Sequence, residues 1–400
     1  MGRNFFVKIC VALVLGVLAG FWIGDTAAFH LFDLIGRLFI NALTLIVVPL
    51  VASSIITGIA KLSKEDSFKE AGTKTLCFFV LTLILALFVG GVFFYLFSPM
   101  FASSQILVAS QQPVLDGEMG LFARFSELAL QFVPSNILAV AASGQMLGLI
   151  LFTGIFGFFV SKLPKGIGDV QGRFWEGVFL IMMRMTSLVM YVMPLAVFAM
   201  MAKVVAQTGL EAVYPVLFFF LSVVSALMVY AFAFLPLLLK VAGISPMQHM
   251  RAVLPALATA FSTSSSAATL PITLECMEER AHVPNRLCGF VLPIATTLNL
   301  SGSALFALMA AFFIATLSGI TLGFFDVAIV VILSLFTGFG MVAGVPSGSL
   351  VALVITLKAV GIASDGVVLL MAVERVLDMA RTTVNVLSNT CCLALVNRKR

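Results

Sequence analysis

Charged residues are scarce in this chain: Asp, Glu, Lys and Arg make up 10% of the 400 residues, whereas 61% are apolar. The mean hydropathy is +1.16. A soluble domain carries about a quarter charged residues, so most of this chain is expected to lie in lipid. The net charge of +5 comes from Lys and Arg residues dispersed between apolar runs, and this dispersion argues against a nucleic-acid partner.

Histidine and cysteine are also few, at three and six residues. The cysteines follow no metal-ligand spacing, so neither a disulfide framework nor a bound metal or other cofactor is predicted. The histidines, His30, His249 and His282, lie near the ends of apolar runs or between them. An intramembrane serine hydrolase needs a base beside its nucleophile, and no such pair is evident at depth, so no enzyme is predicted.

Apolar runs of about 20 residues recur from end to end, each long enough to cross roughly 30 Å of hydrocarbon. We expect one integral membrane unit whose first run is a spanning helix, not a cleaved signal peptide. With both termini cytoplasmic, the inner segments collect most Lys and Arg residues, which indicates a multi-pass protein of the cytoplasmic (inner) membrane. The predicted spans are 5–24, 32–61, 74–99, 130–162 (broken), 174–204, 212–241, 285–316 and 366–396.

Two apolar segments are interrupted by polar residues near their midpoints. Residues 250–276 contain a run from Ser262 to Ser266, and residues 327–360 contain a run from Gly344 to Ser349. Each is predicted to be a re-entrant hairpin, because non-helical backbone at membrane depth persists only where it is buried in protein or lines a cavity. The alternatives are serine hydroxyls bonded to helix carbonyls and a plain loop between two spans. Paired broken segments in two halves point to a transporter's binding site.

The last predicted span carries one polar stripe on an otherwise apolar helix. At about 100° per residue, the polar side chains fall within an arc of roughly 100°. Charged groups at membrane depth are costly, so they are expected to face a cavity or a partner. An ion pair of Asp378 with Arg381 that merely joins helices is the alternative, but a guanidinium suits a carboxylate and Asp378 suits an ammonium group. The stripe consists of Glu374, Asp378, Arg381, Thr382, Asn385 and Asn389.

Four ordered motifs resemble those of the dicarboxylate/amino acid:cation symporter family, which contains the glutamate transporters. The motifs are TSSSAATLPIT at 263–273, LNLSGSAL at 298–305, AGVP at 343–346 and LDMARTTVNVL at 377–387. The likeness is specific over about 250–396, and the pattern of spans extends it over the whole chain.

The resemblance implies an all-α polytopic membrane protein with eight transmembrane helices, two re-entrant helical hairpins and inverted repeats. It also implies a homotrimer and an elevator mechanism, in which a transport part moves against a trimerisation scaffold. The scaffold is expected at about 1–73 and 100–205. The transport part is expected at about 74–99 and 206–400, with hairpin 1 at 250–276 and hairpin 2 at 327–360.

By motif position, Arg381 is expected to pair with the side-chain carboxylate of the substrate, and Asp378 to hold its amino group. Such a pair resembles an acidic amino acid site more than a simple dicarboxylate site. Thr382 and Asn385 are expected to hydrogen-bond the substrate, and backbone and hydroxyl groups at the hairpin tips to close over its main-chain carboxylate. The further expected substrate contacts are Ser264, Ser265, Ser266, Val345, Pro346 and Ser303.

The sequence departs from the family at the sodium sites. The positions of the family's sodium ligands here include Thr82, Asn299, Ser301, Asn385 and Asn389, with Phe79 and Leu83 also in place of ligands. A family Asp is lost at Ser301 and another at Asn389, and Na⁺ prefers anionic oxygen ligands, so we expect sodium coupling to be weakened or absent. The proton-carrying Glu of some relatives is Ala307 here, which leaves Glu374 as the candidate proton carrier.

The sequence therefore predicts a secondary transporter of aspartate, glutamate or related dicarboxylates. Sodium- or proton-coupled symport of C4-dicarboxylates or neutral amino acids on the same fold is an alternative. A substrate-gated channel or receptor is another, and saturable counterflow would separate it from a carrier. The expected partners are a small anionic substrate, the lipid bilayer and further copies of the chain.

Overall fold

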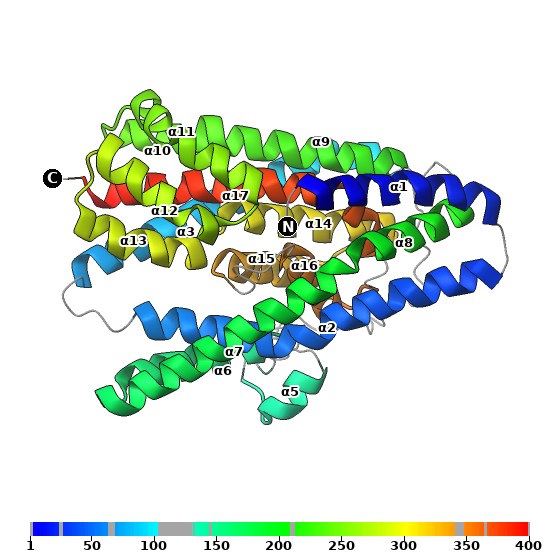
Figure 1. Ribbon diagram of the computed structural model, residues 1–400, viewed down its shortest axis with the longest axis horizontal. Helices are drawn as coiled ribbons and strands as arrows, with labels where there is room; N and C mark the ends of the chain where they lie inside the picture. Colours follow the sequence, from blue (N-terminus) through cyan, green and yellow to red (C-terminus); the bar gives the residue numbers. More distant parts are fainter. Residues whose placement is uncertain are drawn as a thin grey trace.

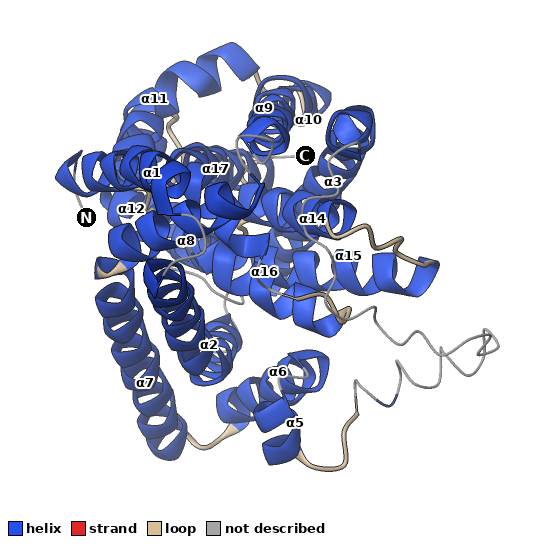
Figure 2. Cartoon of the chain, turned by 90° about the vertical axis from the view of Figure 1, so that its right-hand side faces the viewer, coloured by secondary structure: helices blue, strands red, loops and turns tan. Residues whose placement is uncertain are grey.

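The computed structural model describes residues 3–23, 27–62, 69–102, 130, 133–143, 146–208, 213–340, 348–363 and 366–398. Within these ranges every regular element is a helix (Figures 1 and 2), which confirms the predicted all-helical chain. The helices are α1 (Arg3–Ile23), α2 (Ala27–Leu62), α3 (Lys69–Ala102), α5 (Ile137–Ser143), α6 (Met146–Lys162), α7 (Lys165–Tyr191), α8 (Met193–Thr208), α9 (Val213–Val229), η3 (Tyr230–Phe234), α10 (Leu235–Val241), α11 (Pro246–Thr263), α12 (Ser266–Glu275), η4 (Cys276–Arg280), α13 (Asn285–Leu298), α14 (Ser301–Leu317), α15 (Phe324–Gly338), α16 (Gly348–Ala359) and α17 (Val367–Val396).

The helices pack in two groups. In the first group, α2 lies against α6, α7 and α8, and α1 lies along α8. In the second, α14 packs on α3, α15 and α17, while α17 also contacts α9, α11 and α13. Figure 1 shows α17 running through the middle of the second group, between α9 and α11 on one side and α14 on the other. The groups meet where α1 and α8 reach α17 and where α2 touches α13 and α16.

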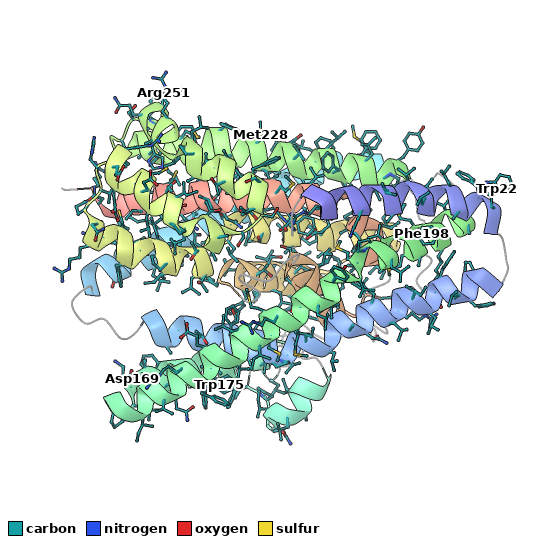
Figure 3. All side chains as sticks on the ribbon, in the orientation of Figure 1. Trp22, Asp169, Trp175, Phe198, Met228 and Arg251 are labelled. Carbon is teal, nitrogen blue, oxygen red and sulfur yellow. The ribbon has the colours of Figure 1, made fainter. Side chains whose placement is uncertain are left out.

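Large apolar side chains cover the outer surface. Trp22 is 90% exposed and Met228 is 53% exposed, and both lie at the edge of the bundle in Figure 3. Among the described residues, three helical stretches are long and apolar enough to cross a membrane: Gly72–Met100, Tyr214–Val241 and Asn285–Leu317. The third is enclosed by neighbouring helices over most of its length, whereas the first two leave more of their surface open, as lipid contact requires.

The predicted span 285–316 is broken in the middle. Helix α13 ends at Leu298, α14 begins at Ser301, and neither Asn299 nor Leu300 has helical backbone angles. The freed N–H of Leu300 donates to the carbonyl oxygen of Gly338 at the end of α15, at 2.8 Å. Non-helical backbone is thus satisfied by a neighbouring helix, which is the condition for such a break inside a membrane protein.

The predicted span 174–204 is longer and is interrupted. It begins earlier, with α7 from Lys165, and continues as α8 after a break at Val192. Pro194 is the second residue of α8, two positions after the break, and a proline has no N–H to donate to the preceding turn. The structure therefore replaces one predicted span with two consecutive helices.

The serine run ends α11 where the sequence predicts an interruption. Ser264 adopts a left-handed conformation with φ of 52°, and Ser265 caps α12 by accepting a hydrogen bond from the Ala268 N–H at 3.2 Å. Helices α11 and α12 then pack against each other. In the second predicted hairpin, α15 packs on α16, but the residues between them, including Val345 and Pro346, lie outside the described ranges.

Candidate functional site

The charged residues of the predicted stripe meet inside the second helix group. Glu374, Asp378 and Arg381 lie four and three residues apart on α17, so the helix brings them onto one face. Glu374 and Arg381 have no exposed side-chain surface, and Asp378 is 14% exposed. Buried charges persist only when they are paired, and these three side chains pair with one another.

Arg381 holds both acids through a single nitrogen. Its Nη2 donates to Glu374 Oε1 at 2.7 Å and to Asp378 Oδ1 at 3.1 Å. The guanidinium also lies 4.1 Å from the centre of the Phe306 ring, which attracts a cation. The Nε and Nη1 atoms are buried without a hydrogen-bond partner. Because a guanidinium carries five N–H donors, Arg381 keeps unused donors for a further carboxylate.

A second arginine, Arg375, belongs to this cluster and was not among the predicted site residues. Its side chain is buried, and its Nη1 lies 3.7 Å from Asp378 Oδ2. The Nε atom of Arg375 is buried without a partner. Arg375 lies three residues before Asp378, about one helical turn, so the two side chains can meet. Its position around the helix falls at the edge of the predicted polar stripe. The signal that could have found it is a charged residue inside an apolar span.

Asn385 joins the stripe to α14. Its Nδ2 donates to Ser303 Oγ at 3.2 Å, and its Oδ1 accepts from the Gly302 N–H at 2.8 Å. A Cβ added at Gly302 would lie 2.9 Å from the Arg381 carbonyl oxygen, so glycine permits this close approach. Thr382 is buried next to Arg381. The structure therefore brings together the predicted residues Arg381, Thr382, Asn385 and Ser303.

The serine tract makes its hydrogen bonds within its own hairpin, although α11 and α12 both pack against α17. In the described part of the chain, the bonds of Thr263 and Ser265 stay within α11 and α12. The side chains of Ser264, Ser265 and Ser266 are partly buried, and Ser264 Oγ has no partner although the atom is buried. Ser264 thus offers an unused hydroxyl, but within the described residues the structure gives this hydroxyl no bond to the charged cluster.

Three of the predicted sodium-site positions, Thr82, Asn299 and Asn389, form a neutral hydrogen-bonded network with Ser388 around Asn299. Asn299 Nδ2 donates to Asn389 Oδ1 at 3.0 Å and to Ser388 Oγ at 3.2 Å, while Asn299 Oδ1 accepts from Thr82 Oγ1 at 3.1 Å. These side chains are buried. The amide oxygens that could bind a cation already accept protein hydrogen bonds, and the network has no carboxylate, so it fits Na⁺ poorly.

The same region retains two unpartnered polar atoms, Ser301 Oγ and Asn389 Nδ2, both buried. By the family resemblance, Ser301 and Asn389 are the two positions at which a carboxylate is expected to be lost. No cluster of three or more His, Cys, Asp or Glu residues with metal-binding geometry occurs in the described ranges.

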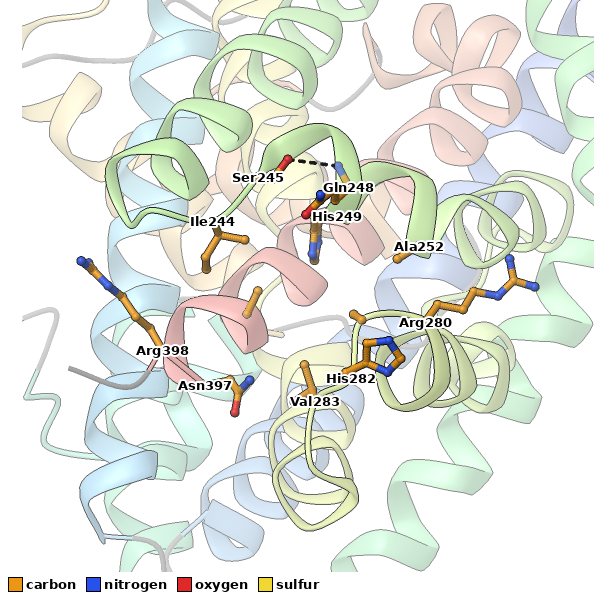
Figure 4. Close-up of a pocket in the computed structure, with 12 residues that line it drawn as sticks. Ile244, Ser245, Gln248, His249, Ala252, Arg280, His282, Val283, Asn397 and Arg398 are labelled. Carbon is orange, nitrogen blue, oxygen red and sulfur yellow. Dashed lines mark hydrogen bonds between the residues drawn. The ribbon is translucent and has the colours of Figure 1, made fainter.

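A separate cavity of about 290 Å³ lies at the C-terminal end of α17 (Figure 4). It is bounded by the start of α11, the turn after η4 and the last turn of α17, and none of the predicted site residues lines it. Figure 4 shows Arg280 and Arg398 at its rim with their guanidinium groups directed away from the centre. The cavity is therefore distinct from the charged cluster, which lies farther along α17 toward its N-terminus.

Comparisons with known proteins agree with the motifs. The family described as "Sodium:dicarboxylate symporter family" matches residues 5–399. The chain is 32% identical to the proton/glutamate-aspartate symporter of Escherichia coli (strain K12), over 97% of this chain and 91% of that protein. It is 32% identical to the proton/sodium-glutamate symport protein of Bacillus subtilis (strain 168), over 98% and 91%. It is 29% identical to human excitatory amino acid transporter 3, over 97% and 84%.

Proposed function

Because the chain belongs to the sodium:dicarboxylate symporter family, and is therefore a multi-pass membrane transporter and not an enzyme, we propose that it carries aspartate, glutamate or related dicarboxylates. The cell (inner) membrane is the proposed location, with both termini cytoplasmic. The acidic substrate is inferred from the family, and the roles of individual residues are inferred from the geometry of α17.

One observation carries the substrate proposal: Arg381 is fully buried and retains two nitrogens without partners. Burial of a guanidinium costs free energy unless its N–H donors have hydrogen-bond acceptors. A substrate carboxylate is such an acceptor, since it accepts two parallel N–H bonds from the planar guanidinium. Glu374 accepts a hydrogen bond from the third nitrogen, Nη2, and we expect the substrate carboxylate to replace Glu374 there.

The remaining substrate contacts are assigned by chemistry. Asp378, the partly exposed acid of the cluster, faces the amino group, while Thr382 and Asn385 hydrogen-bond the substrate. We assign contacts with the main-chain carboxylate to the two hairpin tips, through Ser264, Ser265 and Ser266 in the first and Val345 and Pro346 in the second. Ser303 is assigned a further contact with the substrate. The buried and unpartnered Ser264 Oγ supports the part played by the serine tract, because such a hydroxyl has a hydrogen bond to give.

The two helix groups correspond to the two parts of an elevator. We assign α1, α2 and α5 to α8 to a scaffold that forms a homotrimer, and α3 and α9 to α17 to the transport part. Eight spans and two re-entrant hairpins, α11–α12 and α15–α16, make up this arrangement as inverted repeats. The division is supported by packing that is denser within each group than between them.

Proton coupling through Glu374 replaces sodium coupling in this proposal. The Asn299 network has no carboxylate and its amide oxygens are engaged, which disfavours Na⁺. Glu374 is buried on Arg381, and a proton on Glu374 would release the guanidinium for the substrate. The relatives from Escherichia coli and Bacillus subtilis are both named for proton symport, the second for sodium as well.

Uptake of labelled aspartate and glutamate into proteoliposomes tests the proposal. We expect saturable uptake and counterflow when choline replaces Na⁺, with acceleration by an inward proton gradient. Liposomes that contain the Arg381→Ala variant are the control and should match empty liposomes. A steep requirement for Na⁺ would reject the coupling proposal, and absence of saturable uptake of both amino acids would reject the substrate proposal.

A further inference from the structure

Arg375 is a buried cation on α17 for which the substrate roles above have no use. Its side chain is 10% exposed, and its Nε is buried without a hydrogen-bond partner. Its Nη1 lies 3.7 Å from Asp378 Oδ2, which is close enough for an ion pair but too long for a hydrogen bond. Because Arg375 makes only this long contact with Asp378, its buried positive charge also acts on any other charged group that approaches Asp378.

The two oxygens of Asp378 face two different arginines. Oδ1 lies 3.1 Å from Arg381 Nη2, and Oδ2 lies 3.7 Å from Arg375 Nη1. The second acid, Glu374, is held by Arg381 as well. When Glu374 is ionised, the formal charges of these four side chains cancel, so Asp378 is already neutralised before a substrate binds. A free carboxylate, by contrast, would have no cation beside it until the ammonium group of a substrate bound.

Resting on the substrate site proposed above, we propose that Arg375 is a positioning residue that sets the class of substrate. It holds Asp378 and opposes an ammonium group there, so that the site accepts four-carbon dicarboxylates without an amino group as well as aspartate.

The physical reason is a competition at one carboxylate. An ammonium group beside Asp378 is attracted by that acid and repelled by the guanidinium of Arg375, which lies 3.7 Å from the same carboxylate, so the repulsion offsets part of the attraction. A dicarboxylate has no ammonium group, so this repulsion by Arg375 does not weaken its binding. Its second carboxylate can also accept hydrogen bonds from the unused guanidinium donors.

Competition for uptake of labelled aspartate into proteoliposomes tests this inference, with succinate and unlabelled aspartate as the competitors. For the wild type, we expect half-inhibitory concentrations of the two within about tenfold of each other. In Arg375→Gln, aspartate should bind more tightly and succinate less tightly, which changes their ratio by about tenfold or more. Arg375→Lys keeps the charge and should keep the ratio near that of the wild type.

Arg37→Gln is the matched control, because Arg37 is an arginine on α2 with a 72% exposed side chain that pairs with Asp33. Its ratio should equal that of the wild type. An Arg375→Gln variant that shifts both competitors by the same factor would overturn the inference.

If Arg375→Gln does not fold, competition by succinate for uptake by the wild type can still overturn the inference. Failure of succinate to compete at about a thousandfold excess, while aspartate is transported, would overturn the role of Arg375 and leave the proposed function standing. If the wild type transports no acidic substrate, the proposed function fails, and this inference fails with it.

Discussion

The guanidinium of Arg381 and the carboxylate of Glu374 lie 2.7 Å apart on α17, and neither side chain is exposed. The two residues are seven positions apart, so their side chains together bridge nearly two turns of the helix. Asp378 and Arg375 are the other charged groups at this pair. The contact makes Glu374 a competitor for the nitrogen that a substrate carboxylate would use.

Replacing Glu374 with Gln should remove the pH dependence of substrate binding. In the wild type, a proton on Glu374 weakens its hold on Arg381, so binding takes up a proton and aspartate affinity falls as the pH rises, by up to about tenfold per pH unit. The variant has no proton to exchange at this position. Aspartate titrations of purified protein over a range of pH values provide the measurement.

Glu374→Gln should also separate exchange from net uptake. Exchange of internal for external aspartate should persist, while uptake driven by a proton gradient should fall about tenfold or more, because one proton-carrying group is lost. If proton-driven uptake continues at the wild-type rate, another residue carries the proton.

Arg381→Ala should abolish substrate binding and destabilise the protein. Removal of one partner leaves Glu374 and Asp378 buried without their shared cation, which costs about 3–5 kcal/mol in comparable cases. The double variant Glu374→Gln/Arg381→Ala should regain much of the thermal stability in detergent but no aspartate binding. Recovery of binding in the double variant would show that Arg381 serves stability alone.

Sodium dependence should appear when carboxylates are introduced at Ser301 and Asn389. Both residues are buried and each has an unpartnered polar atom beside the Asn299 network. In Ser301→Asp/Asn389→Asp, two anionic oxygens would favour Na⁺, and we expect Na⁺ to raise aspartate affinity by about tenfold or more. Ser301→Asn/Asn389→Ser is the neutral control. An equal sodium response in both double variants would contradict the role given to the lost carboxylates.

Gly302→Ala should impair transport, whereas Gly289→Ala should not. A Cβ at Gly302 would lie 2.9 Å from the Arg381 carbonyl oxygen and 3.2 Å from Asn385 Oδ1, while a Cβ at Gly289 meets no atom within 4 Å. The added methyl group would push α14 away from α17 and stretch the Gly302–Asn385 hydrogen bond, at a cost of about 1–3 kcal/mol. Thermal unfolding and aspartate uptake of the two variants should therefore differ. Equal behaviour would mean that the helices can adjust at this contact.

Local periodicity was sufficient to predict α17 and the end of α11. The polar stripe has a helical repeat, so the span expected at 366–396 is found at Val367–Val396. The serine run offers hydroxyls that compete with helix hydrogen bonds and can cap the next helix, as Ser265 does. Both features depend on neighbouring residues alone.

The break at Asn299 could not be predicted in the same way, because it depends on a distant partner. Neither position of the break is a glycine or a proline, and the freed Leu300 N–H is satisfied by Gly338 from another helix. The bond between Glu374 and Arg381 was missed for a related reason, since its spacing exceeds the three or four residues that usually pair on a helix. Arg375 lies just outside the stripe defined by Glu374 and Asp378, although the structure pairs it with Asp378.

Calorimetric titration of aspartate into the purified protein, in sodium-free buffer at mildly acidic pH, tests the central claim most directly. The account predicts saturable binding to the wild type, no binding to Arg381→Ala and little change when Na⁺ is added. Binding that requires Na⁺, or binding that survives the loss of Arg381, would contradict it.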